Sequence, residues 1–229
     1  MSLFALSDLH LSSNNSKPMD IFGDIWANHR QKILINWNSI VGKDDCVIVN
    51  GDITWDKNLS DAKIDLDFIS ELNGRKILFQ GNHDYFWNST QKLNELYSNM
   101  FFVKNNFCTY DNVAVCGTRG WVCPNDTLYT DHDKKIYLRE TKRFENSIKM
   151  ALDQGYSDIV AVLHYPPTND KKENSLFVDI IKKYNIKTVV YGHLHGEASF
   201  YSSLMGDVDG TEYKLVSADF LNFKPVKIL

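Results

Sequence analysis

Side chains that can bind metal ions or move protons follow an apolar run at residues 76–80, where Gly81-Asn82-His83-Asp84 begins. The run has the length of a β-strand and stops abruptly. A carboxamide, an imidazole and a carboxylate are poor core material, but they are suitable for metal binding and proton transfer. Because a tight turn uses similar residues, this tetrapeptide alone does not distinguish a turn from a functional site.

The same arrangement recurs elsewhere in the chain. Apolar, strand-like runs also lead into Asp8-Leu9-His10, Gly51-Asp52, His164 and Gly192-His193-Leu194-His195. Side chains at i and i+2 of an extended segment point the same way, so Asp8 and His10 are expected to bind one object together. In α/β folds the C-terminal strand ends share an edge, and ligands bind there. Five of the seven histidines lie at these strand ends, which favours one shared site over five unrelated turns.

The donor atoms at these strand ends indicate transition metals. Seven candidate ligands offer carboxylate, carboxamide or imidazole groups and no thiolate: Asp8, His10, Asp52, Asn82, His164, His193 and His195. Such donors suit manganese, iron, zinc or nickel. Seven ligands are too many for one tetrahedral ion, and they fit two ions that share a carboxylate. Two ions ~3.5–4 Å apart activate water and stabilise an in-line displacement at phosphorus.

Hydrophobic patterning predicts an α/β chain around these strand ends. Helical spacing of apolar residues predicts helices over residues 26–41, 59–72, 138–154 and 176–184, and Ser89 is expected to cap a further short helix. Strands are expected at residues 3–7, 46–50, 76–80, 159–163 and 188–191, antiparallel runs at 101–103, 107–110 and 113–117, and further strands at 198–201, 212–217 and 226–229. Residues 119–133 are expected to form a long polar loop. Since no repeat or linker interrupts the pattern, we expect a single domain over residues 1–229.

Composition excludes several classes of protein. A hydrophobic fraction of 43% in 229 residues is typical of a folded globular chain. The net charge of −4 gives no electrostatic footprint for nucleic acid, which disfavours a nucleic-acid partner without excluding one. No apolar run approaches the ~20 residues of a membrane span, and the N-terminus lacks a basic leader. Because no such run is present, we expect no membrane partner. The four cysteines form no Cys-x-x-Cys pair, so we expect a reducing, cytoplasmic location.

The order of the five motifs resembles the calcineurin-like metallophosphoesterase superfamily, and the match covers residues 8–195. This resemblance implies a four-layer αββα sandwich, in which two mixed β-sheets are flanked by helices as in metallo-dependent phosphatases. It also implies a hydrolase that acts on phosphoric ester bonds. The cofactors would be two divalent or trivalent metal ions, with manganese, iron or zinc favoured.

The resemblance also implies roles for the matching residues. Asp8, His10, Asp52 and His195 would hold one ion, and Asp52, Asn82, His164 and His193 would hold the other, with Asp52 as the bridge. The nucleophile would be a metal-bound hydroxide. His83 would donate a proton to the leaving group, with Asp84 as its orienting carboxylate. An imidazole suits this role because its pKa lies near neutrality.

The substrate is expected to be a small phosphomonoester or phosphodiester. The second motif continues Ile53-Thr54-Trp55-Asp56 instead of Asp-Arg-Gly, which disfavours a protein phosphatase. The loop Gly117-Thr118-Arg119-Gly120-Trp121 resembles a bacterial branch of phosphohydrolases whose substrate this resemblance does not give. Possible substrate contacts are Arg119, Trp55, Tyr85 and Tyr165; ordinary loop packing or a salt bridge would also explain them. A metal-dependent nuclease and a non-catalytic scaffold or binding module of the same fold are the alternative functions.

Overall fold

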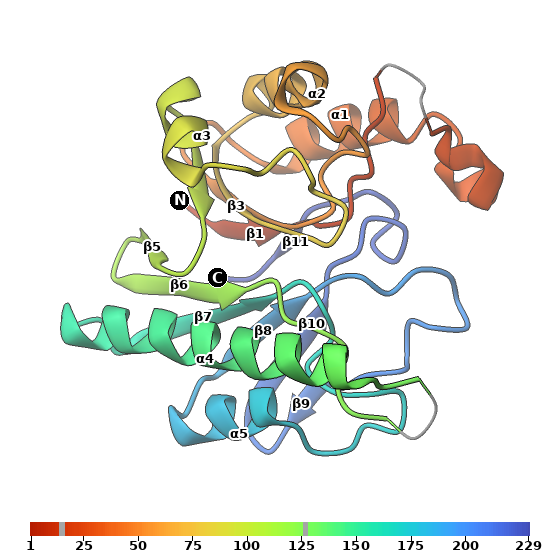
Figure 1. Ribbon diagram of the computed structural model, residues 1–229. Helices are drawn as coiled ribbons and strands as arrows, with labels where there is room; N and C mark the ends of the chain where they lie inside the picture. Colours follow the sequence, from red (N-terminus) through yellow and green to blue (C-terminus); the bar gives the residue numbers. More distant parts are fainter. Residues whose placement is uncertain (14–16, 126–127) are drawn as a thin grey trace. The chain divides into compact units, whose positions relative to one another are not determined.

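The computed structural model describes residues 1–13, 17–125 and 128–229 of the chain. These residues form two compact units. The first unit contains Met1–Phe102 and Val216–Leu229, and the second contains Val103–Leu215. Each unit holds one mixed β-sheet with its own helices (Figure 1). The predicted α/β class with two mixed sheets is therefore confirmed, whereas the single domain over residues 1–229 remains a prediction.

The sheet of the first unit has the strand order β11-β1-β2-β3-β4. Its strands are β1 (Leu3–Ala5), β2 (Cys46–Asn50), β3 (Arg75–Phe79), β4 (Met100–Val103) and β11 (Val226–Lys227). Strands β1, β2 and β3 run parallel, and β11 pairs antiparallel with β1. Since parallel neighbours end at the same edge, the segments that follow β1, β2 and β3 leave the sheet side by side.

Three helices accompany this sheet, namely α1 (His29–Ile40), α2 (Leu59–Glu71) and α3 (Thr90–Leu96). Their apolar sides join strand residues in one core, in which Trp37 of α1 and Leu66 of α2 are fully buried. The expected cap is present, because the Ser89 hydroxyl accepts a hydrogen bond from the Lys92 N–H. Helix α1 begins three residues later than predicted, since residues 24–26 form a short 3₁₀ turn.

The sheet of the second unit has the strand order β5-β6-β7-β8-β10-β9. Its strands are β5 (Phe107–Tyr110), β6 (Val113–Thr118), β7 (Asp158–Leu163), β8 (Thr188–Tyr191), β9 (Gly206–Val208) and β10 (Thr211–Leu215). The four central strands run parallel, while β5 and β9 form antiparallel edges. Helices α4 (Asp131–Asp153) and α5 (Leu176–Lys183) accompany this sheet, with the long α4 beside β6 (Figure 1).

Two further local predictions are wrong. Helix α4 starts at Asp131 instead of residue 138, because Thr130 and Asp133 form a capping box at its first turn. The loop predicted over residues 119–133 therefore ends before Asp131, and its residues 126–127 lie outside the described residues. Residues 198–201 form a turn and not a strand, since the Ser199 hydroxyl donates hydrogen bonds to the carbonyl groups of His195 and Gly196. Within the described ranges, no helix combines the length and apolar character needed to cross a membrane.

Candidate metal centre and active site

The segments that leave β1 and β2 carry three predicted metal ligands in an unusual backbone conformation. Asp8, His10 and Asp52 have φ values of 56°, 43° and 49°, a left-handed region that non-glycine residues seldom adopt. The two segments continue side by side, because the N–H groups of Asp8 and His10 donate to the carbonyl oxygens of Gly51 and Asp52 at 2.9 and 3.0 Å. The extended geometry assumed for residues 8–10 is thus wrong. Strained backbone of this kind gathers at functional sites.

The Asp52 carboxylate lies between two imidazole rings. Its Oδ2 is 3.8 Å from His10 Nε2 and 3.9 Å from His83 Nε2, and its Oδ1 accepts a 2.8 Å hydrogen bond from the His83 N–H. The 3.8 Å separation is too long for a hydrogen bond. Two atoms that each lie about 2.1 Å from one ion are up to roughly 4 Å apart. The pair His10 and Asp52 therefore fits two ligands of a shared metal ion.

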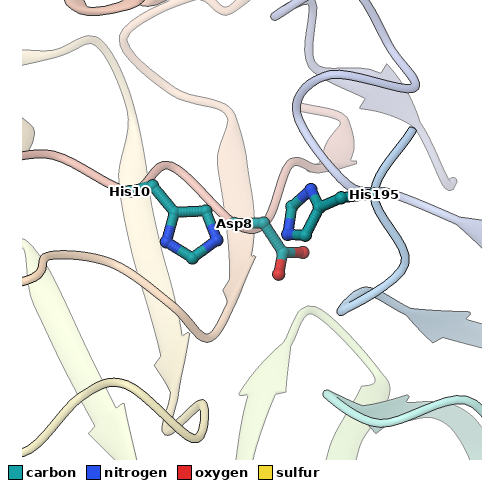
Figure 2. A group of neighbouring side chains, drawn as sticks. All are labelled: Asp8, His10 and His195. Carbon is teal, nitrogen blue, oxygen red and sulfur yellow. The ribbon is translucent and has the colours of Figure 1, made fainter. Parts of the chain in front are cut away.

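The Asp8 carboxylate is fully buried at the start of this site. It accepts hydrogen bonds from the hydroxyl groups of Ser7 and Ser217, the latter at 3.2 Å. Figure 2 shows the side chains of Asp8 and His10 on the segment that leaves β1. Buried carboxylate oxygens and imidazole nitrogens are a donor set for a hard or borderline divalent ion.

Asp84 holds the second and third motifs together. Its buried carboxylate accepts three backbone hydrogen bonds, from Asp52 N–H (2.9 Å), Ile53 N–H (2.8 Å) and Gly81 N–H (2.7 Å). These bonds fix the position of Asp52 relative to the loop that carries His83. The sequence indicated Asp84 as a chemically able residue, but it gave no sign of this bridging arrangement.

Gly81 permits the close approach of these two loops. A Cβ at this position would lie 2.2 Å from both the backbone nitrogen and Oδ1 of Asp52. No side chain fits at that distance, so glycine is required here for packing against a predicted ligand. Asn82 follows in the same loop and is half-buried.

The predicted acid His83 is accessible, with one third of its side chain exposed. Trp55 packs against it at a ring distance of 4.3 Å and stacks on His10 at 4.7 Å with an angle of 19° between the planes. The Lys17 ammonium lies 4.0 Å from the centre of the same Trp55 ring. Tyr85 is 58% exposed, and its ring is 6.4 Å from His83. Both aromatic residues predicted to contact substrate in this unit therefore lie beside the imidazoles.

No motif in the sequence indicated the pocket that Trp26 and His29 line beside His10. This pocket has a volume of about 470 Å³, and Trp26, His29 and Arg30 are among its lining residues. The Trp26 ring packs edge-on against His10 at 5.9 Å, and His29 Nε2 is placed to donate to the His10 carbonyl oxygen at 3.2 Å. Burial lowers the pKa of His29, which favours its neutral form. The contact of the His29 side chain with the His10 backbone gives His29 a positioning role.

The second unit brings together its own predicted ligands. His164 follows β7 and His193 follows β8, and their rings lie 5.3 Å apart at 76°. The His193 backbone is also left-handed, with a φ of 71°. Tyr165 is buried, and its ring packs against that of the predicted metal ligand His193 at a distance of 4.1 Å. Its side chain therefore supports His193 instead of being exposed to a substrate. His195 lies two residues further along and is half-buried.

Arg119 follows β6 in the same unit. Its carbonyl oxygen accepts a 2.9 Å hydrogen bond from the Tyr165 N–H, and its guanidinium lies 4.7 Å from the Trp121 ring. The Trp121 ring in turn lies 5.2 Å from that of Tyr165. The Arg119 loop is thereby attached to the segment that carries His164.

Comparisons with known proteins agree with these features. A probable cyclic nucleotide phosphodiesterase of Coxiella burnetii is 25% identical over 92% of this chain and 83% of its own length. The Gene 66 protein of Mycobacterium phage L5 is 36% identical over 34% of this chain and 37% of its own length. The crystal structure of a phosphopantetheinyl hydrolase from Mycobacterium tuberculosis has a similar fold, with a TM-score of 0.57 and 15% identity over 100% of this chain and 95% of that one.

The family model for calcineurin-like phosphoesterases matches residues 1–197, which include all five motifs. The donor set found in the two units is of the kind that this metal-dependent family requires. The chain belongs to the calcineurin-like phosphoesterase family and is a metal-dependent hydrolase of phosphoric esters.

Proposed function

We propose that the chain hydrolyses a small phosphomonoester or phosphodiester at two metal ions. The observation that carries the proposal is the Asp52 carboxylate between the imidazoles of His10 and His83. One ion would be held by Asp8, His10, Asp52 and His195, and the other by Asp52, Asn82, His164 and His193. On this proposal the two units act as one domain. When bound, such ions activate water and stabilise charge on the phosphoryl oxygens.

His83 would act as the acid that protonates the leaving group. His83 Nε2 lies 3.9 Å from Asp52 Oδ2, the same oxygen that lies near His10. One third of the His83 side chain is exposed, so a substrate can contact it. Trp55 holds the ring by packing against it. Asp84 would act as a positioning residue, because its carboxylate accepts backbone N–H groups of the two loops. Arg119 would contact substrate from the second unit.

On this proposal the pocket lined by Trp26, His29 and Arg30 would hold the part of a small substrate that lies away from the metal ligands, none of which lines it. A volume of about 470 Å³ fits a ligand of nucleotide or sugar-phosphate size. Trp26 offers an aromatic wall and Arg30 a cation. A metal-dependent nuclease remains the alternative. The name of the Coxiella relative makes cyclic nucleotides the first natural diesters to test. The metals, manganese, iron or zinc, and the cytoplasmic location remain predictions.

The test compares bis(p-nitrophenyl) phosphate, p-nitrophenyl phosphate and cyclic AMP as substrates of manganese-loaded wild type, Asp52→Asn and His83→Asn. We expect Asp52→Asn to lose nearly all activity. His83→Asn should lose ~10²–10⁴-fold on cyclic AMP and less on the p-nitrophenyl esters, whose leaving group needs little protonation. His132→Asn, an exposed histidine at the start of α4, is the control and should retain full activity.

Equal rates for wild type and Asp52→Asn on every ester would contradict the proposal. Equal losses for His83→Asn on good and poor leaving groups would leave the metal centre in place and remove the acid role of His83. Cleavage of single-stranded DNA or RNA with no turnover of small esters would support the nuclease.

A further inference from the structure

Helix α4 buries a carboxylate among basic side chains. Glu140 is 2% exposed and accepts hydrogen bonds from the Thr118 hydroxyl, from Arg143 Nη1 at 2.6 Å and from Arg139 Nε at 3.2 Å. Thr118 is the last residue of β6. Because a buried carboxylate is tolerated only when it is paired and hydrogen-bonded, Glu140 fixes two arginines at the end of this strand.

Two further cations belong to the same cluster. The pKa of Lys104 is lowered by burial and then by the charges of Arg143 and Arg119. The pKa of Arg119 is also lowered by burial, and the Glu140 carboxylate opposes this effect. Arg139 and Arg143 contact the Glu140 carboxylate directly, and Lys104 and Arg119 lie close enough for its charge to act on them. The cluster has a surplus of three positive charges, which an anion would compensate.

Arg119 has unused donors that point to the kind of anion. Within the part of the chain that the structure describes, its guanidinium has no hydrogen-bond acceptor, and its side chain is packed on the Trp121 ring. A half-buried guanidinium carries five N–H donors, and leaving them without acceptors is unfavourable. A phosphate group matches this planar fork and accepts two parallel hydrogen bonds.

We propose that Lys104, Arg119, Arg139 and Arg143 form an anion site around Glu140, and that this site binds a phosphate dianion. We refer to these five residues as the Glu140 site. The side chains of Arg139 and Arg143 are 50% and 34% exposed, so solvent reaches the cluster. None of the proposed metal ligands belongs to it, and the proposal stands without the metal-dependent reaction. The dianion is either free inorganic phosphate or a second phosphate group of the substrate.

The first experiment measures inorganic phosphate binding by titration calorimetry. It uses the full chain with Asp52→Asn, which weakens phosphate binding at the metal centre. We expect phosphate to bind to Asp52→Asn, and we expect the added changes Arg119→Ala or Arg139→Ala each to weaken binding at least tenfold. Lys142→Ala, an exposed neighbour on the same helix, is the matched control and should leave the affinity unchanged.

Two outcomes would overturn the proposal. In the first, Asp52→Asn alone removes all phosphate binding. In the second, Arg119→Ala and Arg139→Ala leave the phosphate affinity of Asp52→Asn unchanged. Arg139 is half-exposed, so its variant is expected to fold even where Arg119→Ala does not. Arg119→Lys keeps the charge but loses the planar fork, and it should also bind phosphate more weakly.

A second experiment distinguishes the two sources of the dianion. It compares adenosine 3′,5′-bisphosphate with adenosine 3′-monophosphate as substrates of the manganese-loaded full chain. A KM about tenfold lower for the bisphosphate, lost in Arg139→Ala, identifies a second phosphate of the substrate. Equal KM values, with a phosphate-dependent change in kcat that Arg139→Ala removes, identify free phosphate. Failure of both substrates to react would count against the proposed function, while the calorimetric result would still decide on the Glu140 site.

Discussion

The Asp52 carboxylate owes its position to groups on a neighbouring loop. The backbone N–H groups of Asp52 and Ile53 donate hydrogen bonds to the Asp84 carboxylate. The Asp52 Oδ1 accepts a hydrogen bond from the His83 N–H. Two chain segments with left-handed residues, Asp8 and His10 in one and Asp52 in the other, therefore lie side by side at this buried carboxylate. Such backbone strain persists only where surrounding bonds hold it in place. Those bonds can be tested one residue at a time.

Asp84→Asn should weaken both folding and metal binding. The amide replaces one acceptor oxygen with an NH₂ group that faces backbone donors, so at least one buried hydrogen bond is lost. We expect the free energy of unfolding to fall by roughly 3 kcal/mol, as measured by urea denaturation, and manganese affinity to fall with it. Asp45→Asn is the control, because this less buried carboxylate accepts two backbone N–H groups away from the site. A smaller loss for Asp84→Asn than for Asp45→Asn would contradict the assigned role.

Gly81→Ala should separate the two loops. The new Cβ would lie 2.2 Å from Asp52 N, so one of the loops has to move. We expect at least a tenfold loss of manganese affinity, measured by calorimetry. Gly155→Ala, where the added Cβ meets open space but φ is +87°, should cost roughly 1 kcal/mol of backbone strain and leave metal affinity unchanged. Normal metal affinity in Gly81→Ala would show that the loops tolerate the added methyl group.

At the level of elements, α4 and α5 are joined by a polar contact that depends on pH. Glu145 of α4 accepts hydrogen bonds from Lys183 (2.6 Å) and Tyr184 (2.9 Å) at the end of α5. These bonds lower the pKa of Glu145 to about 2 from an ordinary value of 4.5. A carboxyl group with a lowered pKa in the folded state stabilises the fold above pH 4.5, and this contribution is lost as the pH falls towards 2.

Glu145→Gln should therefore flatten the pH dependence of stability between pH 4.5 and pH 2. At pH 7 the loss should be below about 1 kcal/mol, because the Lys183 side chain is 60% exposed and water screens the pair. Urea denaturation at pH 7 and pH 3 measures both effects. Glu71→Gln, at the exposed end of α2, is the control. A difference between wild type and Glu145→Gln that stays constant over this pH range would rule out the lowered pKa.

The sequence predicted most helices and strands, and its failures have local causes. Apolar spacing located the stripes of α2 and α5 to within a residue, because these stripes are buried. It missed the first turns of α4, since residues 131–136 contain only one apolar residue and the start is marked by hydrogen bonds of Thr130 and Asp133. Glu140 also escaped notice, because a glutamate between arginine and threonine reads as an exposed position. Glu140 becomes buried only when α4 packs against β6 in the folded unit, where the Thr118 hydroxyl donates to its carboxylate.

The candidate site was predictable wherever a motif ends a strand. Asp8, Asp52, His83 and His164 all follow strands as expected. Their supporting groups were not predictable, because the bonds connect distant positions. Asp84 receives the Asp52 N–H across 32 residues, and the Ser217 hydroxyl reaches Asp8 across 209 residues. No spacing rule for a single sequence carries information over such separations.

For the whole molecule, metal removal should lower thermal stability. The proposed ligands include two buried carboxylates, Asp8 and Asp52, whose charges are unfavourable without a cation. At a metal concentration of 100 times Kd, binding adds about 2.7 kcal/mol. We expect EDTA to lower the Tm of wild type by several degrees and manganese to restore it. Asp52→Asn should show a much smaller shift, and equal shifts in both proteins would contradict the proposed ligands.

The first unit is built from both ends of the chain, which has a consequence for its synthesis. Strand β1 pairs with β11, and Asp8 takes a hydrogen bond from Ser217. The second unit consists only of Val103–Leu215, an uninterrupted segment. During synthesis on the ribosome, the second unit can therefore finish folding before β11, the antiparallel neighbour of β1, has been made. Strand β1 would reach its final position only after β11 has been made, so a ribosome that stalls before Ser217 would release a chain whose Asp8 lacks this hydrogen bond.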